Sequence, residues 1–201
     1  MKIKRFIGGN IESNGYVIYQ QDNPDCYIID PGYNPEVFLN FVKEKGLKVI
    51  GILLTHHHYD HVGGVARISS DTGAKVYLHR GDLGMYKGKV DVVLENDSVI
   101  MLGDEEIRVI NTPGHTMGSV CFYCGKSRVI FTGDTVFDTD IGRTDLKDGS
   151  PWDMLATMQN IVDKWENDMV LYPGHGKSCN MKFIRKNNSE FIGAMAMEMK
   201  K

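Results

Sequence analysis

THHHYDH, residues 55–61, directly follows KVIGILL at residues 48–54, a largely apolar run with β-branched side chains. Such a run predicts a strand that is buried on both faces. Histidine and aspartate side chains at the end of a buried strand cost free energy unless a partner satisfies them. We therefore expect a bound partner to satisfy the side chains of the THHHYDH segment.

Three further apolar strands end in the same way, with a glycine next to one histidine or aspartate. They lead into residues 111–116, 132–135 and 172–176. Strands that end side by side would bring these polar groups to one sheet edge. The combined set of five histidines and two aspartates is His56, His58, Asp60, His61, His115, Asp134 and His175.

The chemistry of this set indicates a metal centre. Imidazole nitrogens and carboxylate oxygens suit zinc, and they also suit iron or manganese. Seven ligands are too many for one tetrahedral ion, but they suit two ions that share a carboxylate. Two metals about 3.5–4 Å apart are a recurring hydrolytic site, in which a bridging water becomes hydroxide near neutral pH. The sequence therefore predicts two divalent metal ions, with zinc as the first expectation.

Two other histidines are interpreted as structural. His57 lies between ligands and, in an extended segment, points away from His56 and His58. His79 ends an expected strand alone, and we expect no contact with a substrate. Cys121 and Cys124 form a C-x-x-C pattern within an expected strand, so they point to opposite faces and are predicted to be buried thiols.

The composition of the chain limits the kinds of binding partner that we expect. The chain has 201 residues, of which 42% are hydrophobic and 24% charged, as in a globular protein. The net charge of −3 gives no reason to expect nucleic acid or an anionic membrane as partner. No apolar run approaches the ~18 residues of a membrane span. The first ten residues lack the apolar region of a signal peptide, so we expect a cytoplasmic protein.

The order of expected elements predicts an α/β sandwich of two sheets with helices outside. The sequence is interpreted as one domain over residues 1–201 with a short helical tail from Met181, and it leaves the oligomeric state open. Asp30-Pro31-Gly32 is interpreted as a turn. Expected strands cover 2–7, 16–20, 27–30, 48–54, 75–79, 90–94, 98–102, 106–111, 119–123, 128–132 and 169–172. Expected helices cover 35–45 and 60–70, and others start at 150 and 181.

The histidine and aspartate motif of residues 56–61, with its three downstream ligands, resembles the metallo-β-lactamase superfamily. The resemblance covers nearly the whole chain. It implies a four-layer αββα sandwich with the metal site at one edge of the two sheets. It implies that metal one is held by His56, His58 and His115. It implies that metal two is held by Asp60, His61 and His175, and that the two metals are bridged by Asp134.

Within the superfamily, the segments TPGHT, FTGDT and YPGHG are similar to glyoxalase II-like (hydroxyacylglutathione hydrolase-like) enzymes. The segment IGRTDL at residues 141–146 is similar to the corresponding segment of short bacterial members of the glyoxalase II-like group. This resemblance implies hydrolysis of a small thioester or ester by a metal-bound hydroxide, with Asp60 and Asp134 as catalytic residues and Arg143 binding the substrate. Asp145 stands where the family has a tyrosine, and the tyrosine expected after the last histidine is missing, which leaves the thiol carrier open.

Three alternatives remain open from the sequence. A mononuclear iron enzyme similar to persulfide dioxygenases would consume oxygen. A metal-binding protein without turnover fits less well, because this ligand set leaves coordination positions free. A phosphodiesterase acting on a polynucleotide would need a basic surface, which the charge balance does not support.

Overall fold

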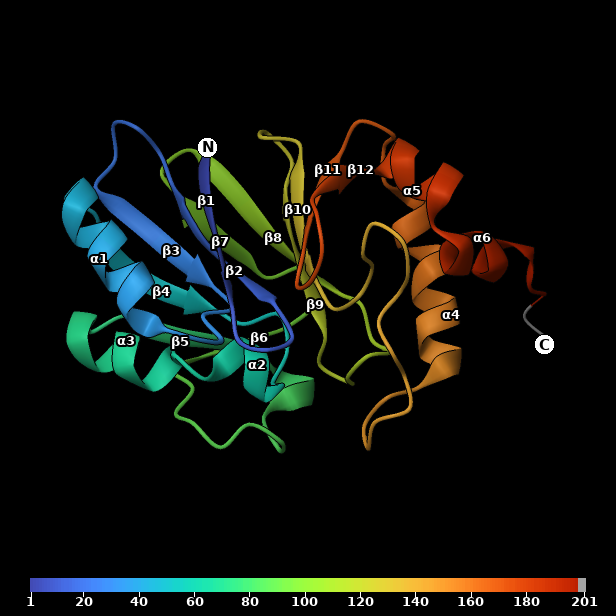
Figure 1. Cartoon of the computed structure of the whole chain (residues 1–201), viewed down its shortest axis with the longest axis horizontal. Helices are drawn as coiled ribbons and strands as arrows, with labels where there is room; N and C mark the ends of the chain where they lie inside the picture. The colour runs from blue at the N-terminus through green and yellow to red at the C-terminus, as the bar shows by residue number, and fades with distance from the viewer. Residues whose placement is uncertain (199–201) are drawn as a thin grey trace.

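The computed structural model describes residues 1–198 and shows two six-stranded mixed sheets packed face to face (Figure 1). In spatial order, the first sheet contains β1 (Lys2–Gly8), β2 (Ser13–Tyr19), β3 (Asp25–Ile29), β4 (Lys48–Leu53), β5 (Lys75–His79) and β6 (Val92–Leu94). The second contains β12 (Cys179–Asn180), β11 (Val170–Pro173), β10 (Val129–Gly133), β9 (Val120–Cys124), β8 (Glu105–Asn111) and β7 (Val99–Leu102).

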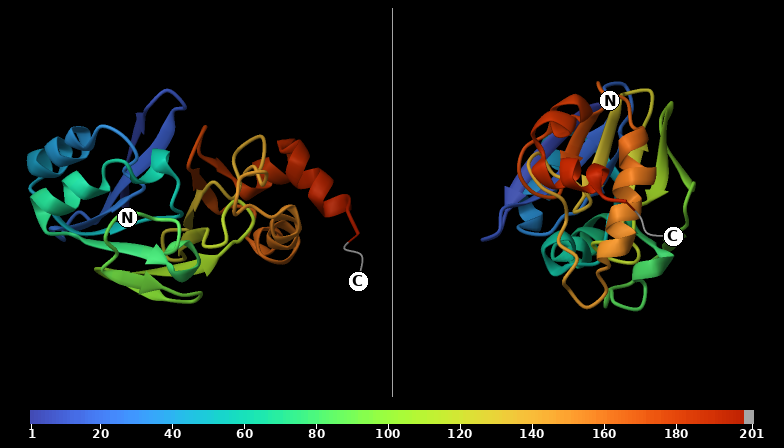
Figure 2. Two further views of the ribbon diagram at one scale, coloured as in Figure 1. Left: turned by 90° about the horizontal axis from the view of Figure 1, so that it is seen from below. Right: turned by 90° about the vertical axis from the view of Figure 1, so that its right-hand side faces the viewer.

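Helices cover the outer faces of both sheets, as Figures 1 and 2 show. The first sheet is covered by α1 (Pro35–Lys45) and α3 (Val65–Thr72), and the short α2 (Tyr59–Val62) precedes α3. The second sheet is covered by α4 (Pro151–Asn160), α5 (Met181–Asn187) and α6 (Ser189–Ala196). Two 3₁₀ turns, η1 (Arg80–Asp82) and η2 (Val162–Lys164), complete the elements. The predicted four-layer αββα sandwich is therefore confirmed.

Three apolar clusters hold the four layers together. The central cluster lies between the sheets and includes Leu53, Phe122 and Phe131, while the other two lie under the helices. Cys124 belongs to the central cluster and Cys121 to the cluster under α4, so the two thiols point to opposite faces, as predicted. Burial raises the pKa of Cys121 to about 11, which keeps the thiol protonated at neutral pH.

The prediction of one continuous helix over residues 60–70 is wrong, because α2 ends at Val62 and α3 begins at Val65. The break lies at Gly63 and Gly64, where the chain packs against the backbone of the loop after β3. The Gly64 N–H donates to the Pro31 carbonyl at 2.7 Å. A Cβ on Gly64 would lie 2.6 Å from that oxygen, and one on Gly63 would lie 2.3 Å from the carbonyl oxygen of Gly32. Only glycine permits this close approach.

Gly32 offers a direct test of this packing. A Cβ at Gly32 would lie 1.5 Å from the carbonyl oxygen of Asp60, which is backbone and cannot rotate away. We expect Gly32→Ala to lower the free energy of unfolding by about 2–3 kcal/mol, since the loop or α2 must shift. Urea unfolding of the metal-free protein measures this, with the open position Gly84→Ala as control. Equal midpoints for the two variants would contradict the packing argument.

Strand direction places the candidate ligands at one edge. β9 is antiparallel to both β8 and β10, and β11 is parallel to β10, so β8, β10 and β11 run the same way. In the first sheet, β4 is parallel to both β3 and β5. The Val120 N–H donates to the Thr55 carbonyl at 2.9 Å, which joins the ends of the two sheets. The loops after β4, β8, β10 and β11 therefore meet.

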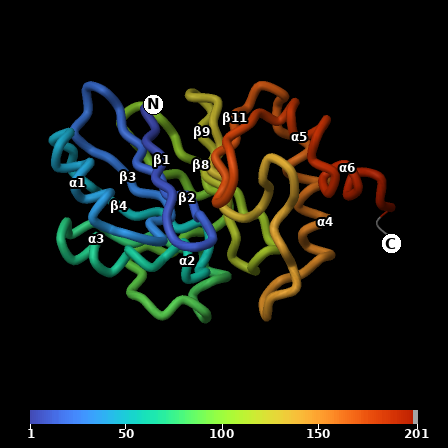
Figure 3. Tube along the Cα trace, in the orientation of Figure 1, coloured from blue at the N-terminus to red at the C-terminus, as the bar shows by residue number. Residues whose placement is uncertain are grey.

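The chain trace in Figure 3 runs from β1, near the middle of the molecule, to α5 and α6 at its right-hand side. In residues 1–198, no helix has both the length and the apolar content to cross a membrane. The expected helical tail starts at Met181 and contains α5 and α6. The predicted domain over residues 1–201, including the end of its tail, extends beyond the described residues.

Candidate metal centre

The structure brings all seven predicted ligand side chains together at the edge where the two sheets meet. Six of them form two groups, and within each group the ligand atoms lie within 4.8 Å of one another. The first group is His56, His58 and His115, and the second is Asp60, His61 and His175. These are the two sets that the sequence resemblance implies for metal one and metal two.

Asp134, which follows β10, lies between the two groups. Its Oδ1 is 3.4 Å from Nε2 of His61, and its Oδ2 is 3.5 Å from Nε2 of His175. The same Oδ2 lies 3.6 Å from Nε2 of His115 in the other group. Asp60 is placed differently, with its Oδ2 at 3.2 Å from Nε2 of both His61 and His175. Asp134 is therefore positioned to bridge, and Asp60 to serve one group.

Three of the inward-facing atoms are buried and have no hydrogen-bond partner: His56 Nε2, His61 Nε2 and Asp134 Oδ1. Buried polar atoms without a partner are rare in folded proteins, because desolvation costs free energy that nothing returns. The atoms belong to side chains that divalent metals accept as ligands. The residues present thus fit a pair of divalent ions.

Hydrogen bonds on the outer side of the rings fix which nitrogen faces inward. Nδ1 of His115 lies 2.8 Å from the Arg143 carbonyl, and Nδ1 of His175 lies 3.0 Å from the Ile11 carbonyl. A carbonyl only accepts, so each Nδ1 carries a hydrogen, and Nε2 is the nitrogen left to face a metal. His61 directs Nδ1 to Asp30 at 3.2 Å with the same result.

His56 follows the same rule through a hydroxyl. The Thr55 hydroxyl donates to Asp30 Oδ2 at 2.6 Å, so it accepts from His56 Nδ1 at 3.0 Å. His58 is the exception, because its Nδ1 faces the group and lies 2.8 Å from Nε2 of His115. The two nitrogens share a hydrogen bond when one of them carries the hydrogen, and when neither does, both lone pairs are free for one cation.

The two groups differ in electrostatics. Burial lowers the pKa of His58 to about 4, and the neighbouring His115 acts in the same direction. Burial also opposes the charged form of His175, but Asp134 and Asp60 outweigh it and raise the pKa of His175 to about 10. A metal at the second group must therefore displace a proton from His175.

A cavity of about 670 Å³ opens beside the ligands, and Tyr59, Phe137, Leu146 and Arg143 contribute to its wall. The Arg143 guanidinium donates to both carboxylate oxygens of Asp145, at 2.7 and 2.8 Å. The structure thus places the predicted substrate-binding arginine at the cavity, with an exposed carboxylate as its partner.

The family model of the metallo-beta-lactamase superfamily matches residues 8–175, a range that includes all seven candidate ligands. The chain belongs to the metallo-beta-lactamase superfamily. Within this superfamily, the probable metallo-hydrolase YqgX of Bacillus subtilis is 32% identical over 98% of this chain and all of its own length. The hydroxyacylglutathione hydrolase of Maricaulis maris is 36% identical over 75% of this chain, but over 57% of its own length.

Solved structures agree with the fold. The crystal structure of BLEG-1 B3 metallo-beta-lactamase has a TM-score of 0.87 and 30% identity, covering 94% of this chain and 98% of that one. TTHA1623, solved in a di-iron-bound form, has a TM-score of 0.83 and 28% identity, covering 92% and 98%. The resemblance inferred from the ligand motif is confirmed, and these similarities do not establish a substrate.

Sequence reasoning missed Asp30, which was interpreted only as part of a turn. Its side chain is buried and accepts from the Thr55 N–H at 2.8 Å, the Thr55 hydroxyl and His61 Nδ1. Asp30 directly follows the apolar end of β3, as the ligands follow their strands, but Pro31 separates it from Gly32. The position of an aspartate at the end of an apolar strand is the one sequence signal that Asp30 shares with the ligands.

The structure also places the two histidines that were interpreted as structural. His57 directs its backbone N–H and its Nδ1 to Asp82, each at 2.9 Å, so it packs behind the ligands as predicted. His79 accepts from the Gly81 N–H at 3.3 Å at the start of η1. Among the described residues, none of the groups suited to a metal includes His79.

Proposed function

We propose that this protein is a dinuclear metal-dependent hydrolase that cleaves a small thioester or ester of the hydroxyacylglutathione type. The observation that carries the proposal is the set of buried ligand atoms without hydrogen-bond partners, which belong to the two groups and to the carboxylate between them. The open cavity beside them supplies room for a substrate. The 36% identity to a hydroxyacylglutathione hydrolase supports the thioester class.

When bound, two divalent ions, zinc first and iron or manganese as alternatives, supply an activated water and polarise the scissile carbonyl. The proposed ligands are those of the two groups, with Asp134 shared. Asp134 joins the two groups, because its Oδ1 faces His61 and its Oδ2 faces both His115 and His175. Asp60 directs Oδ2 to His61 and His175, so its other oxygen is available to orient the attacking water.

Arg143 is the proposed contact for an anionic group of the substrate. We expect Arg143→Ala to raise KM roughly five-fold for S-lactoylglutathione, since an exposed ion pair contributes little in water. Hydrolysis of an uncharged acyl thioester should keep its KM. Steady-state kinetics with both substrates measures this, and Arg67→Ala, on the outer face of α3, is the control. An equal change for both substrates would contradict a role in binding the anion.

The proposal is tested with a panel of substrates. The metal-stripped protein is reloaded with zinc, iron or manganese and assayed with S-lactoylglutathione, simpler acyl thioesters and acyl esters. Metal-dependent release of thiol supports the thioesterase. Oxygen consumption with a persulfide, without any thioester hydrolysis, would instead assign the alternative iron oxygenase chemistry. A cytoplasmic location and the absence of nucleic-acid partners stay predictions from the sequence.

A further inference from the structure

Asp82, in η1, is a carboxylate that the proposed mechanism does not use, yet it is completely buried. Its Oδ1 accepts from the Gly118 N–H at 2.7 Å. Its Oδ2 accepts from the His57 N–H at 2.9 Å, from His57 Nδ1 at 2.9 Å and from the Thr116 hydroxyl at 3.0 Å. Four donors on one buried carboxylate form a strong local network, because charge-assisted hydrogen bonds are about twice as strong as neutral ones.

The donors come from two separate ligand loops. His57 lies between the ligands His56 and His58, and Thr116 directly follows the ligand His115. One carboxylate therefore joins the two loops that supply the whole first group. The contact is close, since a Cβ on Gly118 would lie 2.4 Å from Asp82 Oδ1.

His57 also approaches a second carboxylate. Its Nδ1 lies 3.6 Å from Oδ2 of Asp148, an atom that is buried and has no hydrogen-bond partner. The ligand atoms of His57, His58 and Asp148 lie within 4.8 Å of one another, so a further ion at this place is the competing interpretation. However, Nδ1 of His57, the nitrogen nearest Asp148, donates to Asp82, so this nitrogen carries a hydrogen and is not free for a metal.

We propose that Asp82 is a positioning residue that sets the spacing of His56, His58 and His115 and thereby the affinity of the first metal. This inference rests on the ligand set of the proposed function. The second group has a different support, because Asp30 holds His61 directly. Loss of Asp82 should therefore weaken one metal site and leave the other.

The test is Asp82→Asn, which keeps the shape but replaces one acceptor oxygen with a donor. Zinc binding is titrated in competition with a chromophoric chelator, and the cobalt-substituted protein gives the visible spectrum of each site. We expect the affinity of one site to fall about 10–100-fold, the range found when outer partners of metal ligands are removed. The other site should keep its affinity.

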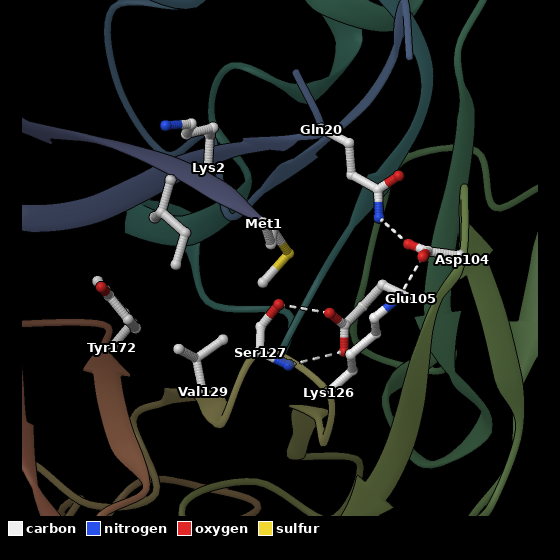
Figure 4. A pocket seen from close by; sticks show the side chains of 10 residues that line it. Met1, Lys2, Gln20, Asp104, Glu105, Lys126, Ser127, Val129 and Tyr172 are labelled. Carbon is white, nitrogen blue, oxygen red and sulfur yellow. Dashed lines mark hydrogen bonds and ion pairs between the residues drawn. The ribbon is translucent and has the colours of Figure 1, made fainter. Parts of the chain in front are cut away.

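Glu105→Gln is the matched control. Glu105 is a buried carboxylate at the opposite end of β8 from the His115 loop, and it accepts from the Ser127 N–H and hydroxyl (Figure 4). Its replacement removes a buried charge of the same kind without touching a ligand loop. We expect both zinc affinities of the wild type in this variant.

His57→Ala keeps the inference testable if Asp82→Asn does not fold, because it leaves Asp82 with its other donors. It should weaken the same site by a smaller factor. Wild-type affinity at both sites in both variants would overturn the inference, as would an equal loss at both sites. A third zinc equivalent that His57→Ala removes would also overturn it. A wild type that binds two zinc ions without hydrolysing thioesters would refute the proposed function alone.

Discussion

Asp134→Asn is expected to lower metal-dependent thioester hydrolysis roughly 10³-fold, which corresponds to the several kcal/mol that a bound metal contributes to a transition state. Asp134 lies between the two ligand groups, with one oxygen toward His61 and the other toward His115 and His175. An amide keeps the size of the side chain, but it offers one neutral acceptor in place of two charged ones. The variant should therefore lose the shared ligand.

The measurement is kcat/KM together with the number of metal ions retained after dialysis. Asp104→Asn is the control, because this exposed carboxylate pairs with Lys126 and Gln20, away from the ligand loops. It should keep wild-type turnover and metal content. An Asp134→Asn protein with wild-type turnover would show that the carboxylate does not bridge.

Removal of the metal is expected to lower the midpoint of thermal unfolding by roughly 10 °C. At a metal concentration of about 1,000 times Kd, binding stabilises the folded state by about 4 kcal/mol. For a chain of this size, the midpoint of thermal unfolding shifts by about 2–4 °C for each kcal/mol of stability. Without metal, the buried Nε2 atoms of His56 and His61 and Oδ1 of Asp134 have no hydrogen-bond partner.

Differential scanning calorimetry with chelator, and again after zinc is restored, measures this shift. The shift should shrink as the pH falls, because Asp134 and Asp60 raise the pKa of His175 and the metal must compete with its proton. The Asp134→Asn protein should show a smaller shift than the wild type. Identical midpoints with and without metal in the wild type would contradict a bound metal that stabilises the fold.

The features that sequence reasoning predicted well depend on local rules. Pro35 and Gly46 mark the two ends of α1, and the structure has both where expected, with Gly46 at a positive φ of 65°. Ser150 caps α4 by accepting from the Asp153 N–H at 3.2 Å, as its place before Pro151 predicts. The ligands were found because each follows an apolar strand, and buried strands that run together end together.

The features that it missed depend on contacts between distant segments. The break between α2 and α3 follows from the loop after β3, where Gly64 meets the Pro31 carbonyl, and helical periodicity cannot show this. Asp82 lies 25 residues from His57 and 36 residues from Gly118, and no spacing rule connects them. Asp148 is identified only by its distance from His57.

The most direct test of the central claim is a zinc titration of the metal-free protein, with hydrolysis of S-lactoylglutathione and a simple acyl thioester followed at each step. We expect no turnover without metal and a rate that rises until two equivalents of zinc are bound. Iron and manganese are titrated in the same way. If none of the three metals restores turnover of either thioester, the assignment as a dinuclear thioester hydrolase is contradicted.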